Sequence, residues 1–348
     1  MRARIAFRAN CAILAPVERE RLRGLDALRG FAALVVLWFH LRAQFDVGFY
    51  PRRGYLAVDF FFMMSGYVMA RTYEPGMLGG GRFLVKRVRR LAPTITLGSL
   101  IGFFVLWWTG FPGLAAVTLL NLLLLPALWA GPAFPLDTPA WSIFFELFAN
   151  ALHGFWLHRV RTTYLAGLVI AAGALTLVLA LGVGSYSQGS EAGRFVGGFP
   201  RVVFAYFYGV VLWRLWQDRP PVRPHPVLLI LVAAFLFAPR SVVADFMFVA
   251  AVCPLLIAGG LAANPDVWAS IVGRLSFPLY AVHRPILALA ALLGVGWFLG
   301  AVSALLLSAA MTLAFPRRPG FGKKGYPKSE AAERGKGGSV AAQAVPDA

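Results

Sequence analysis

Acidic residues are scarce in this chain, which has 15 Asp and Glu against 33 Lys and Arg in 348 residues and a formal net charge of +18. Charged residues of both signs make up only 14%, whereas 59% of the residues are hydrophobic. This composition excludes an ordinary soluble domain. The basic residues cluster in short segments between apolar runs, a pattern typical of membrane topology rather than of a nucleic-acid surface. The sequence therefore predicts an all-α integral membrane protein and no nucleic-acid partner.

Cysteine is also nearly absent, and Cys11 and Cys253 alone form no disulfide framework. The N-terminal residues hold several arginines and one apolar run, CAILAPV, which is too short for the core of a cleaved signal peptide. Residues 1–22 are therefore predicted to be a basic cytoplasmic tail. Residues 316–348 are rich in Gly, Lys, Ser and Ala and are predicted to be a disordered basic tail.

The membrane domain is expected over residues 23–315. It contains ten apolar segments that are candidates for membrane spans, at 25–44, 55–73, 94–111, 140–158, 164–183, 199–217, 226–239, 241–263, 273–294 and 297–315. A further segment, 113–130, is interrupted by Asn121 and Pro126. If it does not span, the basic loops all fall on one side, and the positive-inside rule then places both termini in the cytoplasm. About ten transmembrane helices are therefore predicted.

Ionisable residues occur inside these apolar segments. Arg29 and His40, at the two ends of RGFAALVVLWFH, lie about 16 Å apart along a helix. With ten spans, His40 is expected in the outer half of the membrane with Asp59, Glu146 and His283. Such groups are costly in lipid unless they are paired or hydrated, so they usually line a cavity and mark function. A histidine with a carboxylate suffices for general base catalysis. The pattern therefore predicts a polar catalytic cavity, and no metal site.

Structural interpretations remain open for each of these residues. Either histidine could serve only as a hydrogen bond between helices, and Asp59 could pair with an arginine. Glu146 could act as an anchor at the membrane interface. Ser65 is a possible nucleophile, but its place beside Gly66 favours close helix packing.

The segment GRFLVKRVRRLAP places Arg82, Lys86, Arg89 and Arg90 on one face of a helix and apolar residues on the other. A basic amphipathic helix of this kind is typical of an anionic lipid surface. Several guanidinium groups together also suit a polyphosphate ligand. Both interpretations stay open at this level.

Four blocks of the sequence resemble the acyltransferase family 3, polytopic membrane O-acyltransferases that modify bacterial surface polysaccharides, peptidoglycan and small glycosylated molecules. The blocks are RGLDALRGFAALVVLWFH, GYLAVDFFFMMSGYVMA, RFLVKRVRRLAP and PAWSIFFELF. A weaker fifth block is GRLSFPLYAVHRPI, in which Arg284 stands between His283 and Pro285. The chain departs from the family at AFPRRPGFGKK, where a glutamate-proline element is common.

The resemblance implies a ten-helix enzyme of the bacterial inner membrane that O-acetylates a carbohydrate or glycolipid acceptor, such as a surface polysaccharide. No cofactor is expected to stay bound, and acetyl-CoA or a similar acyl-CoA is the expected donor substrate. The implied catalytic residue is His40, and the implied donor-binding residues are Arg29, Arg87 and Arg90. Membrane lipids are further expected partners.

The mechanism expected from this resemblance has His40 remove a proton from the acceptor hydroxyl while Glu146 or Asp59 orients the imidazole. A covalent acyl-histidine is the competing mechanism. A different class of function, a transporter or flippase for a lipid-linked glycan or small solute, would use buried His and Glu as a proton relay. It would be expected to show internal repeats, and none is visible in the sequence.

Overall fold

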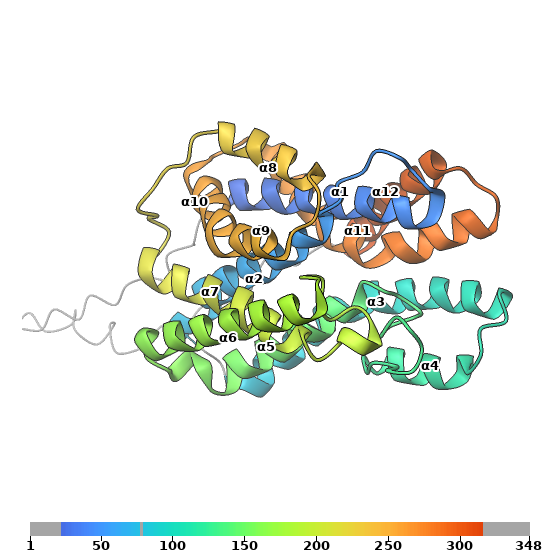
Figure 1. Cartoon of the computed structure of the whole chain (residues 1–348), viewed down its shortest axis with the longest axis horizontal. Coiled ribbons are helices and arrows are strands. Elements are labelled where there is room, and N and C mark those ends of the chain that lie inside the picture. Colours follow the sequence, from blue (N-terminus) through green and yellow to red (C-terminus); the bar gives the residue numbers. More distant parts are fainter. Residues whose placement is uncertain (1–21, 77–78, 316–348) are drawn as a thin grey trace, which may run out of the picture. The chain divides into compact units, whose positions relative to one another are not determined.

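The computed structural model describes residues 22–76 and 79–315, which belong to one compact unit (Figure 1). Over these residues the chain is helical, and its only β-type pairing is an isolated bridge between Pro132 and Glu191. The all-α prediction is confirmed for this part of the chain. Both predicted tails lie outside the described residues except for Leu22.

Within the two described ranges, six helices are long and apolar enough to cross a membrane. They are α1 (Arg23–Phe45), α3 (Gly80–Trp108), α6 (Thr162–Val183), the continuous segment made of α9 (Val242–Met247), η5 (Phe248–Val252) and α10 (Cys253–Ala262), α11 (Val267–Leu292) and α12 (Trp297–Ala314). The other described α-helices are α2 (Ala57–Tyr73), α4 (Leu114–Leu122), α5 (Ala140–Phe155), α7 (Gly198–Trp216) and α8 (Val227–Phe237). A membrane protein is therefore supported, although six rather than ten helices meet the length and composition of a span.

Helix α4 has nine residues, so it is about 14 Å long and covers less than half of a hydrocarbon core. The chain turns back after Leu122, and the Asn121 side chain holds this turn. This side chain donates a hydrogen bond to the carbonyl oxygen of Leu125 and accepts one from the backbone N–H of Leu136, each at 3.2 Å. The interruption noted in the sequence thus forms a folded loop, and α4 is too short to cross.

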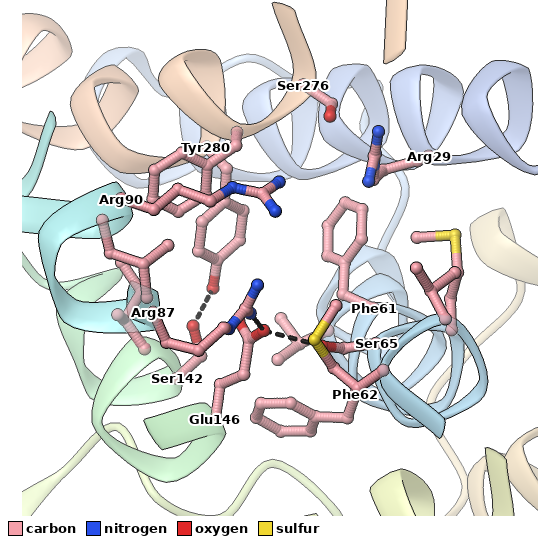
Figure 2. Close-up of a pocket in the computed structure, with 17 residues that line it drawn as sticks. Arg29, Phe61, Phe62, Ser65, Arg87, Arg90, Ser142, Glu146, Ser276 and Tyr280 are labelled. Atoms are coloured by element: carbon pink, nitrogen blue, oxygen red, sulfur yellow. Dashed lines mark hydrogen bonds and ion pairs between the residues drawn. The ribbon is translucent and has the colours of Figure 1, made fainter. Parts of the chain in front are cut away.

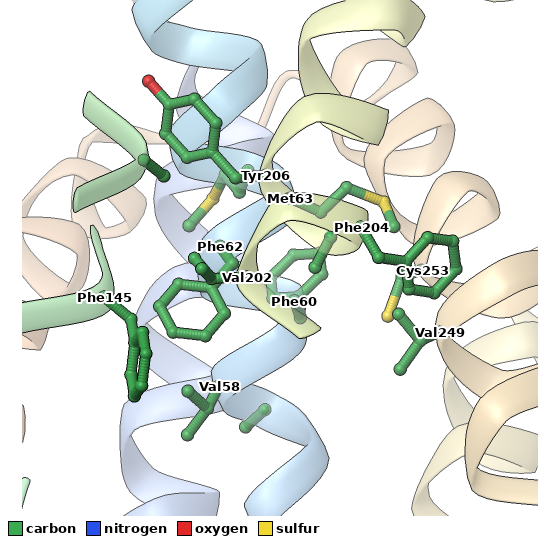
Figure 3. Close-up of a cluster of buried hydrophobic side chains, with 14 of the residues drawn as sticks. Val58, Phe60, Phe62, Met63, Phe145, Val202, Phe204, Tyr206, Val249 and Cys253 are labelled. Carbon is green, nitrogen blue, oxygen red and sulfur yellow. The ribbon is translucent and has the colours of Figure 1, made fainter. Parts of the chain in front are cut away.

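Helices α2 and α7 pack through a reciprocal pair of glycines. A Cβ atom on Gly66 would lie 1.8 Å from the carbonyl oxygen of Tyr206, and one on Gly209 would lie 1.8 Å from that of Met63. The backbones can approach this closely only because both side chains are absent. Around this contact lies the main buried apolar cluster, in which α2 and α7 contribute most of the side chains shown (Figure 3).

Helices α1 and α11 run side by side in the same direction. Near one end Arg29 of α1 donates a hydrogen bond to the carbonyl oxygen of Gly273, and eleven residues later His40 meets His283 of α11. At 1.5 Å per residue the two contacts lie about 16 Å apart along the pair. The helix pair therefore has a polar contact at each of two levels. The level of Arg29 and Gly273 is called the Arg29 end, and the level of His40 and His283 is called the His40 end.

Candidate active site

A cavity of about 120 Å³ lies at the Arg29 end among α1, α2, α3, α5 and α11 (Figure 2). Apolar side chains form much of its wall. The polar side chains that line it are Arg29, Ser65, Arg87, Arg90, Ser142, Glu146, Ser276 and Tyr280. Five residues predicted from the sequence are thus brought together, including all three arginines assigned to the donor.

Glu146 organises one side of this cavity. Its Oε1 atom accepts a hydrogen bond of 2.7 Å from the hydroxyl of Ser65 and pairs with Nη2 of Arg87. The Arg87 side chain is 6% exposed and that of Glu146 is 19% exposed. Pairing a largely buried charge with its opposite avoids the large cost of leaving it alone. Ser65 therefore points at the carboxylate, while its neighbour Gly66 supplies the close packing.

Arg29 is held at the opposite wall. Its Nη2 atom donates to Oδ1 of Asp26 at 2.6 Å and to the carbonyl oxygen of Gly273 at 3.1 Å. Arg90 extends toward the same space from α3 (Figure 2). Guanidinium groups on different helices that converge on one cavity suit an anion with several oxygens.

Tyr280 and Phe61 line the cavity, and Tyr280 lies one helical turn before His283 on α11. The Tyr280 and Ser142 hydroxyl oxygens are 2.6 Å apart and share a hydrogen bond. The rings of Phe61 and Tyr280 meet edge to face, with centroids 5.6 Å apart. The ring of His283 follows, 6.0 Å from that of Tyr280. The sequence interpretation missed Tyr280 and Ser142, although both are polar residues within apolar helices.

His40 and His283 form a pair of imidazoles beyond this aromatic contact. Nδ1 of His40 lies 3.0 Å from Nε2 of His283 and 2.9 Å from the carbonyl oxygen of Val36. Nδ1 of His283 lies 3.1 Å and 2.7 Å from the carbonyl oxygens of Leu279 and Tyr280. His283 is fully buried, whereas His40 is partly exposed.

These contacts assign the ring protons. Carbonyl oxygens only accept hydrogen bonds, so Nδ1 of His283 carries a proton and its Nε2, in the neutral ring, is an acceptor. Nδ1 of His40 then donates to His283 and to Val36. The proton of neutral His40 is thereby on Nδ1, and its Nε2 keeps a lone pair that can take a proton.

The expectation that Asp59 or Glu146 orients His40 requires correction, because both carboxylates are bound elsewhere. Glu146 pairs with Arg87, as described above. Asp59 forms a two-pronged ion pair with Arg201 of α7, with Oδ1 2.9 Å from Nε and Oδ2 2.6 Å from Nη2. Both side chains of this pair are 0% exposed. The side chain that contacts His40 is instead that of His283, and Asp59 has the structural pairing that was its alternative interpretation.

Within the described residues, no group of three or more His, Cys, Asp and Glu side chains is placed to hold a metal ion. The site is built from two imidazoles, three arginines, one carboxylate and several hydroxyls. Such a set can hold an anionic substrate and move a proton.

The model of an acyltransferase domain family matches residues 22–316. The chain therefore belongs to this acyltransferase family, and the family prediction is confirmed.

Protein 2 in the picA locus of Rhizobium radiobacter is 36% identical over 184 residues, which are 46% of this chain and 95% of that protein. O-acetyltransferase OatA of Staphylococcus aureus is 37% identical over 82 residues, which are 21% of this chain and 12% of that protein. No solved structure matches the chain. These findings class the chain as a membrane O-acyltransferase.

Proposed function

We propose that this protein transfers an acetyl group from acetyl-CoA to a hydroxyl of a carbohydrate-containing acceptor in a surface polysaccharide or glycan. One observation carries the proposal. Parallel helices α1 and α11 hold a cavity with three arginines at one level and a base-competent imidazole about 16 Å further along. A long donor with a charged head and a reactive thioester tail fits such a separation.

The charged head of the donor binds among Arg29, Arg87 and Arg90. Acetyl-CoA carries several phosphate groups, and guanidinium groups bind phosphate oxygens through paired, charge-assisted hydrogen bonds. Glu146 fixes the position of Arg87 and lowers the local excess of positive charge. The pantetheine arm then extends past Ser142 and Tyr280 toward His40, which requires the Phe61–Tyr280 contact to open.

Transfer takes place at the His40 end. Nε2 of His40 takes the proton of the acceptor hydroxyl as the hydroxyl oxygen attacks the thioester carbonyl carbon. A C–O bond forms, the C–S bond breaks, and the thiolate leaving group takes the proton back from the imidazolium. His283 keeps His40 in the productive tautomer and accepts its Nδ1–H throughout.

The direction of transfer follows from the charges of the loops. The Arg29 end bears most of the described basic residues of loops and helix ends, among them Arg82 and Arg89 near the start of α3, Arg159, Arg161 and Arg219. We place this end in the cytoplasm of a bacterial inner membrane and the acceptor on the far side. Replacing Cys11 and Cys253 and adding one cysteine at Gly48 or at Arg219 tests this. An impermeant maleimide applied outside should label position 48 only.

Purified protein in detergent, incubated with acetyl-labelled acetyl-CoA, provides the test of function. Release of free CoA, with label passing to water or to an added sugar, is the expected result. Folded protein that neither binds nor turns over acetyl-CoA would contradict the proposal. It would favour the alternative function, a transporter or flippase.

A further inference from the structure

Asp137 and Arg284 take no part in the chemistry described above, and both hold buried atoms that lack partners. Asp137 is 1% exposed, yet neither of its carboxylate oxygens has a hydrogen-bond partner among the residues that the structure describes. Nη1 of Arg284 is likewise buried without one. Nearly all buried polar groups in proteins are hydrogen-bonded, so three unsatisfied atoms call for an explanation. Each residue is also a charged neighbour of the other.

The Asp137 and Arg284 side chains lie near the level of the histidines on α11. A Cβ atom on Gly98 of α3 would lie 2.9 Å from Oδ2 of Asp137 and 2.7 Å from the carbonyl oxygen of Ala281. The Asp137 carboxylate is therefore level with the segment of α11 between Tyr280 and His283. Arg284 follows Tyr280 by four residues, one helical turn further along the same face.

The chemistry of this pair selects a class of ligand. A carboxylate only accepts hydrogen bonds and a guanidinium only donates them, so a group bound between the two must do both. Neighbouring hydroxyls of a sugar ring meet this requirement. A second carboxylate, that of Glu191, also acts on Arg284. An anionic ligand would thus meet the negative charge of Glu191 beside the one positive charge of Arg284.

We propose that Asp137 and Arg284 form the acceptor subsite and bind two hydroxyls of a neutral sugar ring. This inference rests on the proposed acetyl transfer and names the acceptor class for it. The Arg284 charge acts on both His40 and His283, so a ring held there lies close to the imidazole pair that activates the attacking hydroxyl. The acceptor and the donor head then occupy opposite sides of the Phe61–Tyr280 contact.

Asp137→Asn and Arg284→Gln test the subsite, since both remove the charge and leave a polar side chain. Asp137→Asn also keeps the shape of the side chain. The full chain in detergent is given labelled acetyl-CoA with methyl hexopyranosides as neutral probes and the methyl glycoside of glucuronic acid as the anionic probe. Transfer to sugar and hydrolysis of acetyl-CoA are measured separately. Arg194→Ala, at an exposed residue of the short helical turn η4 (Ala192–Arg194), is the control.

The subsite predicts that each variant raises KM for the neutral glycosides about tenfold or more, because a charge-assisted hydrogen bond is lost. Hydrolysis of acetyl-CoA should stay within about twofold of wild type, as should both activities of Arg194→Ala. The double variant Asp137→Asn/Arg284→Gln restores electrical neutrality. It should transfer no better than the single variants.

Three results would overturn the subsite. One is an equal loss of hydrolysis and transfer, and another is recovery of transfer in the double variant, since both indicate a structural charge balance. The third is wild-type protein that hydrolyses acetyl-CoA but acetylates no neutral glycoside, or prefers the glucuronide. Wild-type protein that leaves acetyl-CoA intact instead contradicts the proposed function itself.

Discussion

Nε2 of His283 lies 3.0 Å from Nδ1 of His40, and both nitrogens of His283 are engaged, because its Nδ1 faces two backbone carbonyl oxygens. The second histidine thereby occupies the place that a carboxylate takes in many catalytic sites. It fixes the tautomer of His40 without bringing a negative charge into an apolar region. It is a positioning residue for the proposed transfer.

Replacing His283 by Ala should therefore lower kcat by about 10- to 100-fold and leave KM for acetyl-CoA unchanged, as for other groups that orient a functional imidazole. His283→Gln is the matched variant. Its side-chain amide can accept from His40 and donate to a backbone carbonyl, so it should recover part of kcat. Equal losses for Ala and Gln would show that the hydrogen bond to His40 does not matter.

Arg90→Gln should raise KM for acetyl-CoA by about tenfold, because a phosphate contact in the donor cavity is lost. The change should vanish with S-acetylpantetheine, a thioester without the nucleotide phosphates. Steady-state kinetics with the two donors make the comparison. A variant that is impaired equally with both donors would place Arg90 outside phosphate recognition.

The Asp59–Arg201 pair should stabilise the folded protein and take no part in catalysis. Both side chains are fully buried, and removing one partner of such a pair costs about 3 to 5 kcal/mol. Asp59→Asn should therefore lower the melting temperature in detergent and the yield of folded protein. Activity per folded molecule should remain within about twofold of wild type. A variant that loses activity while keeping full stability would show that Asp59 takes part in the reaction.

Glu74, just after α2, leads to a prediction of how the stability of the protein depends on pH. Burial raises the pKa of its carboxyl group, but hydrogen bonds from His153 and Arg214 and the charge of Arg214 outweigh burial, so the pKa is lowered. A carboxyl group whose pKa is lowered by folding stabilises the protein above its unfolded pKa, and this stabilisation is lost as the pH falls through the folded pKa.

Glu74→Gln should therefore be less stable than wild type at pH 7, and the two should converge as the pH falls below about 4. Thermal unfolding at a series of pH values measures the difference. A gap in melting temperature that stays constant with pH would contradict the role given to the ionised Glu74.

The sequence led correctly to the helical class and the family, and it assigned Arg29, Arg87 and Arg90 to one site, where they line one cavity. Motif spacing was sufficient for these arginines because each residue occupies a definite turn of a long helix. The sequence grouped Glu146 with His40 instead, whereas the structure places Glu146 beside Arg87. The expected number of spans is only partly matched, since short helices such as α2 and α5 depend on their neighbours rather than on their own length and apolarity.

Pairings between helices were not predictable from spacing. Asp59 pairs with Arg201, which is 142 residues away in the sequence, and His40 pairs with His283, which is 243 residues away. Helix depth alone placed Asp59, Glu146 and His40 at comparable levels, but the rotation of each helix decides which side chains meet. Asp137 was missed because it lies in a loop whose burial only the folded structure reveals.

The central claim is that Nε2 of His40 activates the acceptor hydroxyl. Single-turnover transfer from labelled acetyl-CoA to a sugar acceptor, in wild-type protein and in His40→Ala, tests it most directly. We predict that His40→Ala still binds acetyl-CoA with unchanged affinity, because the arginines remain, and that its rate of transfer falls at least about 100-fold. A variant that binds the donor and transfers the acetyl group at the wild-type rate would contradict the account.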